Sequence, residues 1–129
     1  MSNSYRVRVA AGSLRAVEAP AHFPHRWTEG GVSVEADFTG AHLLHLSAAG
    51  CVLNDLFREA AALGLALDGA AVEADGDFDA EWSSTGISYV VELDSPADPS
   101  DLAELLHRVD EVAEIPKALR AGAPVSRGR

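Results

Sequence analysis

The feature that most limits the fold of this chain is the run from Ala41 to Asn54, which contains no aspartate, glutamate, lysine or arginine. Good helix formers continue to Gly64, a plausible C-cap, and Thr39 is a plausible N-cap. A helix that is apolar nearly all round is usually buried on several sides, often against a partner chain. We therefore expect a long buried helix over residues 40–64.

The segments before this helix alternate between apolar and polar residues. Tyr5–Val9 places valines on one face and arginines on the other, and Val32–Phe38 alternates in the same way, so both predict half-buried strands. Leu14–Ala19 is a weaker strand candidate. Pro20–Gly31 has two prolines and a Gly-Gly pair and predicts a loop.

The segments after the helix predict a hairpin and a second helix. Residues 71–82 and 86–94 alternate as strands and would be joined through Ser83–Gly86, with Trp82 facing inward. Asp98 and Pro99 give a helix start signal before a leucine-rich amphipathic run, and Pro116 opens a short helical turn. This order predicts a single α+β domain over residues 1–129, with antiparallel sheets and segregated helices.

Charge and composition exclude several classes of function. Ten basic and 20 acidic residues give a net charge of −10, which repels nucleic acids and anionic membranes. We see neither a transmembrane run nor a signal peptide. A single cysteine excludes a disulfide framework and agrees with a reducing compartment, so we expect a cytoplasmic protein.

The only cysteine, Cys51, falls on the more polar stripe of the long helix. At 100° per residue this stripe holds Ser47, Cys51, Asn54, Asp55 and Arg58. The opposite stripe, which we expect to face the core, holds Leu46, Leu53, Phe57 and Ala60. Free cysteines usually pack as small hydrophobic residues, so inert packing is one reading and a thiol facing a polar cleft is the other.

Reactivity at Cys51 requires the thiolate, which a cation favours and a carboxylate opposes. Asp55, one turn later, opposes it unless Arg58 neutralises the carboxylate. Arg15 is a candidate cation from elsewhere in the fold.

Metal and cofactor sites are not expected. His22 with His25, and His42 with His45, have the i, i+3 spacing of metal ligands, but Cys51 lies on the opposite side of the helix from His42. Hydrogen bonding is the commoner role of such histidines. The carboxylates of residues 75–79 lack the glycine and glutamate that a calcium loop needs.

Two segments resemble the OsmC/Ohr family of osmotically inducible and organic-hydroperoxide-resistance proteins. The segment "LLHLSAAGCVLNDL" resembles the family's first-cysteine helix, and "VDEVAEIPKALRAG" resembles the region of its second cysteine. The resemblance runs from about Tyr5 to Val125. It implies an intertwined homodimer, with active sites at the subunit interface and a stress-response function.

The resemblance also implies a reaction and a set of site residues. In the family, the first cysteine attacks a peroxide, becomes a sulfenic acid and is captured by the second cysteine. Cys51 corresponds to the attacking thiol, and Arg15 lies near the position of the family's arginine. Ile115 stands where the second cysteine would be, and the family's acidic residue falls at Ala41 or His42.

Three functions remain open at this point. In the first, the protein is a one-cysteine peroxidase in which Cys51 reacts, supported by Arg15 or a histidine, and a small external thiol resolves the product. In the second, it is a homodimer that binds a small apolar or hydroperoxide-like ligand without turnover. In the third, Cys51 only packs.

Overall fold

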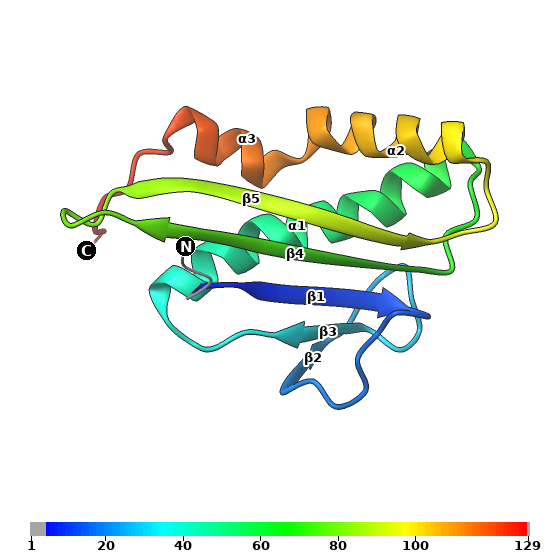
Figure 1. The fold of residues 1–129 in the computed structure, drawn as a ribbon, viewed down its shortest axis with the longest axis horizontal. Coiled ribbons are helices and arrows are strands. Elements are labelled where there is room, and N and C mark those ends of the chain that lie inside the picture. Colours follow the sequence, from blue (N-terminus) through cyan, green and yellow to red (C-terminus); the bar gives the residue numbers. More distant parts are fainter. Residues whose placement is uncertain (1–4, 129) are drawn as a thin grey trace.

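The computed structural model describes residues 5–128 of the chain, and its elements follow the predicted α+β order (Figure 1). In chain order they are β1 (Val7–Gly12), β2 (Ala21–Phe23), β3 (Val32–Glu35), α1 (Gly40–Leu63), β4 (Gly69–Phe78), β5 (Ser84–Asp94), α2 (Pro99–Val112) and α3 (Glu114–Ala121).

The strands form one antiparallel sheet in the order β2-β3-β1-β4-β5. The register places Val34, Val9, Val72 and Val91 opposite one another on four neighbouring strands. Because side chains directly opposite each other share a face, these valines form a continuous apolar row. Val9 and Val72 are at most 1% exposed, so the row belongs to the core.

Helix α1 lies across one face of this sheet, and the predicted caps are confirmed (Figure 1). The Thr39 hydroxyl accepts a hydrogen bond from the His42 amide at 3.1 Å, and Gly64 ends the helix in the left-handed conformation. The predicted apolar stripe is confirmed as well, since Leu53, Phe57 and Ala60 are buried. The long run without charges is therefore explained by contacts on several sides of α1.

Helices α2 and α3 run along the β5 side of the sheet and pack against α1 (Figure 1). Helix α2 begins behind Asp98 with Pro99 in its first turn, as its sequence predicted, and buries Leu105 and Val109. Ala113 separates α2 from α3 and is itself fully buried. This arrangement brings the start of α3 over the middle of α1.

Three predictions for the first part of the chain were wrong. Leu14–Ala19 forms turns instead of a strand. The amides of Arg15 and Ala19 donate hydrogen bonds to the carbonyl oxygens three residues earlier in the chain, which is typical of turns. The predicted loop at 20–31 contains the short edge strand β2. Strand β3 ends at Glu35, so Phe38 lies outside the sheet and is 88% exposed.

The hairpin between β4 and β5 is confirmed, but its turn lies earlier than predicted. The Asp79 carboxylate accepts hydrogen bonds from the amides of Glu81 and Ser83, both at 2.9 Å, and this closes the turn before Ser84. Trp82 therefore belongs to the turn, with a positive φ of 64°, and is 70% exposed instead of facing inward.

We predict opposite effects of adding a methyl group at two glycines. A Cβ at Gly76, on β4, would lie 2.3 Å from the Gly86 carbonyl oxygen and 2.5 Å from His45 Nε2, so Gly76→Ala should destabilise the protein by about 2 kcal/mol. A Cβ at Gly50, inside α1, meets nothing within 4 Å, so Gly50→Ala should stabilise it by about 1 kcal/mol. Urea unfolding measures both, and effects of the same sign would contradict the packing at Gly76.

No helix within residues 5–128 is long and apolar enough to cross a bilayer.

Candidate functional site

The thiol of Cys51 lies half-buried where α1 meets the start of α3. The amide of Ile115, in the first turn of α3, donates to the Cys51 sulfur at 3.4 Å. Ile115 therefore stands beside the thiol, as the match to the family's second-cysteine region predicted. Because amides at a helix N-terminus favour negative charge, this contact stabilises a thiolate.

Two carboxylates also lie close to the same sulfur. Asp55 Oδ2 is 4.0 Å from Cys51 Sγ, and Glu114 Oε2 is 3.9 Å from it. A thiol has one proton, so it donates to only one of these oxygens at a time. The sulfur thus contacts one amide that favours the thiolate and two carboxylates that favour the thiol.

The net effect of these surroundings is to raise the pKa of the Cys51 thiol above its ordinary value. Burial away from water is the largest cause, and the Ile115 amide opposes it. The charges of Asp55 and Glu114 raise the pKa further. Cys51 is therefore a neutral thiol at neutral pH, and any reaction that uses the thiolate must first remove its proton.

Asp55 is the buried member of the cluster, with a fully buried carboxyl group although it falls on the polar stripe of α1. Burial and the hydrogen bond with Glu114 raise the pKa of Asp55 to about 6, and Arg58 opposes this shift. Arg58 Nη2 lies 3.2 Å from Asp55 Oδ2 and 3.3 Å from Glu114 Oε1. Arg58 therefore forms ion pairs with both carboxylates, but the charge of Asp55 still raises the pKa of the Cys51 thiol.

A second set of ion pairs fixes the position of Arg58. Its Nε lies 3.1 Å from Glu59 Oε2, and Glu59 Oε1 accepts a hydrogen bond from Arg108 of α2 at 2.5 Å.

Cys51, Asp55 and Glu114 have ligand atoms within 4.8 Å of one another and are the described residues that could hold a metal ion together. Arg58 already supplies the two carboxylates with a positive charge.

The structure places Arg15 apart from this cluster. Arg15 follows β1, and its side chain lies against Gly30. A Cβ atom added to Gly30 would lie 2.8 Å from Arg15 Nε. Among the described residues, the charges that shift the pKa of Cys51 are those of Asp55 and Glu114. Arg58 is the cation that contacts the two carboxylates beside the thiol.

The histidines of α1 have the hydrogen-bonding roles that the sequence favoured over metal binding. His42 Nδ1 is 2.6 Å from the Thr39 hydroxyl, and His45 Nδ1 donates to the Ala41 carbonyl at 2.7 Å. Nε2 of the buried His45 has no hydrogen-bond partner among the described residues. Both rings lie in an aromatic cluster with Tyr5.

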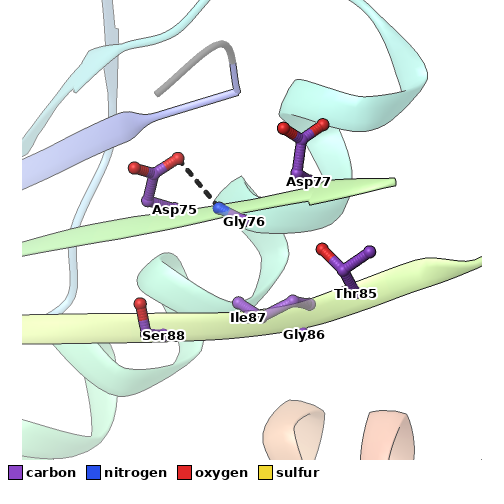
Figure 2. Close-up of a pocket in the computed structure, with 7 residues that line it drawn as sticks. All are labelled: Asp75, Gly76, Asp77, Thr85, Gly86, Ile87 and Ser88. Carbon is purple, nitrogen blue, oxygen red and sulfur yellow. Dashed lines mark hydrogen bonds between the residues drawn. The ribbon is translucent and has the colours of Figure 1, made fainter. Parts of the chain in front are cut away.

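Cys51 does not line any of three cavities found among the described residues. A shallow one of about 480 Å³ lies on the β4–β5 hairpin, as Figure 2 shows, with Asp75 and Ser88 on adjacent strands in its wall. A second of about 260 Å³ lies between α1, β5 and α3, and a third of about 300 Å³ lies between α1 and the β1–β3 part of the sheet. The second is bounded by Ala48, one turn before Cys51, and by Pro116, next to Ile115.

Comparison with known proteins decides the family. Residues 33–127 match the family model described as OsmC-like protein. The chain belongs to the OsmC-like protein family. The matched range begins in β3 and includes both α1 with Cys51 and α3 with Ile115, so the two contacting halves of the site lie inside it.

A solved structure shows the fold of this OsmC-like chain. It is an OsmC-like hydroperoxide resistance protein from Jannaschia sp. CCS1, similar at a TM-score of 0.51 with 15% sequence identity. The alignment covers 97% of this chain and 93% of that one. None of the curated proteins matches the chain in sequence.

Sequence reasoning missed Glu114 as a member of the site. The residue lies 63 positions after Cys51, and only the packing of α3 on α1 brings it to the sulfur. Its place directly before Ile115-Pro116, the segment that matches the family's second-cysteine region, was the signal that could have identified it.

Proposed function

We propose that this OsmC-like protein reduces organic hydroperoxides at Cys51 and that an external thiol completes the cycle. The observation that carries the proposal is the half-buried Cys51 sulfur in contact with the Ile115 amide. That amide stabilises negative charge on sulfur as the thiol proton leaves. The hydroperoxide resistance named for the similar Jannaschia protein supports the same chemistry.

The reaction would convert the thiol and the hydroperoxide into a sulfenic acid and an alcohol. The sulfur attacks the terminal oxygen of the O–O bond, and the remaining oxygen leaves as the alcohol. With Ile115 beside the sulfur instead of a second cysteine, an external thiol forms a mixed disulfide and releases water. A second thiol then restores Cys51.

The cavity of about 260 Å³ supports an organic substrate over hydrogen peroxide. Its walls are mostly apolar, and it adjoins both halves of the site through Ala48 and Pro116. An alkyl group placed there would gain from burial, which hydrogen peroxide cannot do.

Arg15 belongs to the proposal as a second catalytic residue supplied across a homodimer interface. The family resemblance implies sites at such an interface, and one chain leaves Arg15 apart from Cys51. Large apolar side chains on the surrounding segments support a covered surface, since Val17, Phe23 and Phe38 are 71%, 59% and 88% exposed.

A peroxide assay tests the enzyme. Mixing the protein with an alkyl hydroperoxide should place one sulfenic acid on Cys51, seen by mass spectrometry after trapping, and a thiol should then sustain consumption. Cys51→Ser should reduce consumption to the background rate while keeping the fold, and Arg15→Ala should slow it. Equal rates for the wild type and Cys51→Ser would exclude the proposed reaction.

Ligand binding without turnover is the second candidate, and the cavity of about 300 Å³ favours it. This cavity is lined mainly by apolar side chains from β1, β3 and α1, while the raised pKa of Cys51 holds its thiol neutral. In this case small apolar compounds would raise the thermal stability equally in the wild type and in Cys51→Ser.

A further inference from the structure

Two carboxylates lie beside the thiol of Cys51. The positions that match the family's acidic residue are Ala41 and His42, neither of which is a carboxylate. Asp55 and Glu114 instead approach the sulfur from a different part of α1 and from α3. Both carboxyl groups therefore lie at positions other than the one that the resemblance assigns to the family's acidic residue.

We propose that Asp55 is a proton shuttle that removes the proton of the Cys51 thiol and delivers it to the leaving alkoxide. The inference rests on the proposed function and names a further catalytic residue for it. The Asp55 carboxylate takes the proton as sulfur attacks the terminal peroxide oxygen. The O–O bond breaks, its electron pair stays on the alkoxide, and the protonated Asp55 then converts the alkoxide into the alcohol.

Geometry supports this role for Asp55. Its Oδ2 is 4.0 Å from Cys51 Sγ and its carboxyl group is buried, so the proton would pass between two groups sheltered from bulk water. The other carboxyl oxygen, Oδ1, is buried without a hydrogen-bond partner. An oxygen without a partner is free to carry the proton between the two steps.

Glu114 stabilises the protonated form of Asp55. Two carboxyl groups can form a hydrogen bond with each other only if one of them is protonated. The hydrogen bond between Asp55 and Glu114 raises the pKa of Asp55 and lowers the pKa of Glu114. This hydrogen bond therefore stabilises Asp55 in its protonated form once it has taken the thiol proton. A group with a pKa of about 6 can both accept and donate a proton near neutral pH.

The charged groups that face Asp55 are Arg58 on its own helix and Glu114 on α3, besides the Cys51 thiol. Arg108 of α2 reaches this network through Glu59. Arg58 contacts both carboxylates, which keeps an ionised Asp55 available as a base.

Two reagents separate proton transfer from a simple effect of charge. Alkylation by iodoacetamide needs the thiolate, but its leaving iodide needs no proton. Asp55→Asn removes a charge that raises the pKa of Cys51, so alkylation at neutral pH should become several-fold faster. The reaction with an alkyl hydroperoxide should instead become on the order of 100-fold slower, because the alkoxide has lost its acid.

A percarboxylic acid provides a chemical rescue. Its leaving group is a carboxylate that departs without a proton, so the deficit of Asp55→Asn should largely disappear with this substrate. Glu104→Gln, which removes an exposed carboxylate from α2, is the matched control and should behave as the wild type in all three reactions.

The outcomes distinguish the two proposals. A wild type that is alkylated but inert to hydroperoxide overturns the proposed function and the shuttle together. An active wild type whose Asp55→Asn variant changes by the same factor with iodoacetamide and hydroperoxide overturns the shuttle alone. If Asp55→Asn does not fold, Glu114→Gln should move the acidic limb of the hydroperoxide pH profile to lower pH, and an unmoved limb overturns the shuttle.

Discussion

Ile115→Cys is expected to turn the single-thiol protein into one that closes an internal disulfide when it meets a hydroperoxide. The Ile115 nitrogen is 3.4 Å from Cys51 Sγ, and Cβ lies only about 2.5 Å from the nitrogen of the same residue. A thiol at this position would capture the sulfenic acid without a bimolecular step. Turnover with a dithiol reductant should rise at least about tenfold over the wild type, because the resolving thiol is held in place.

Mass spectrometry of the unreduced protein measures this outcome directly, as a loss of two hydrogens and a peptide that links α1 with α3. Val90→Cys is the matched control, since Val90 is an exposed apolar residue of β5 and should give only mixed disulfides. A variant at Ile115 that also forms only mixed disulfides would show that its side chain points away from the sulfur.

The second large effect is a pH dependence of stability that Asp55 creates. Its pKa is about 6 in the folded protein and 3.8 ordinarily, so folding favours the protonated form. The stabilisation by protonated Asp55 is complete below the ordinary pKa and is lost as the pH rises through about 6. Asp55→Asn, which resembles the protonated acid, should therefore gain stability relative to the wild type as the pH rises.

Urea unfolding at several pH values measures this gain. Between about pH 4 and pH 8 the free energy of unfolding of Asp55→Asn relative to the wild type should increase by about 2 kcal/mol. The lowered pKa of Glu114 acts in the opposite direction and keeps the effect below that of Asp55 alone. Glu104→Gln should show a nearly constant difference, and a constant difference for Asp55→Asn would contradict the raised pKa of Asp55.

The sequence alone identifies some of the residues used in these two predictions, but not all of them. Cys51 and Arg58 could be placed on one stripe of α1 because helical spacing is a local property. The contacts of the cluster with Glu114 and the Ile115 amide depend on how α3 packs on α1, which no local pattern encodes. Asp55 illustrates the difference, since it was placed on the polar stripe and is nevertheless fully buried.

The fold shows the same division between local and long-range information. The caps of α1 and the start of α2 were predicted because Thr39, Gly64 and Pro99 act through their own backbone neighbourhoods. The inward orientation of Trp82 was predicted by extending the alternation of β4. It was wrong because the Asp79 carboxylate closes the turn first and takes Trp82 out of the strand.

The contact between α3 and the sulfur is made by the backbone amide of Ile115 and is independent of its side chain. Any amino acid except proline therefore preserves it. Mutational drift at this position can remove or restore a second thiol while the sulfur keeps its amide partner. Side-chain scanning would score the position as tolerant, although a backbone ester substituted there would reveal its contribution.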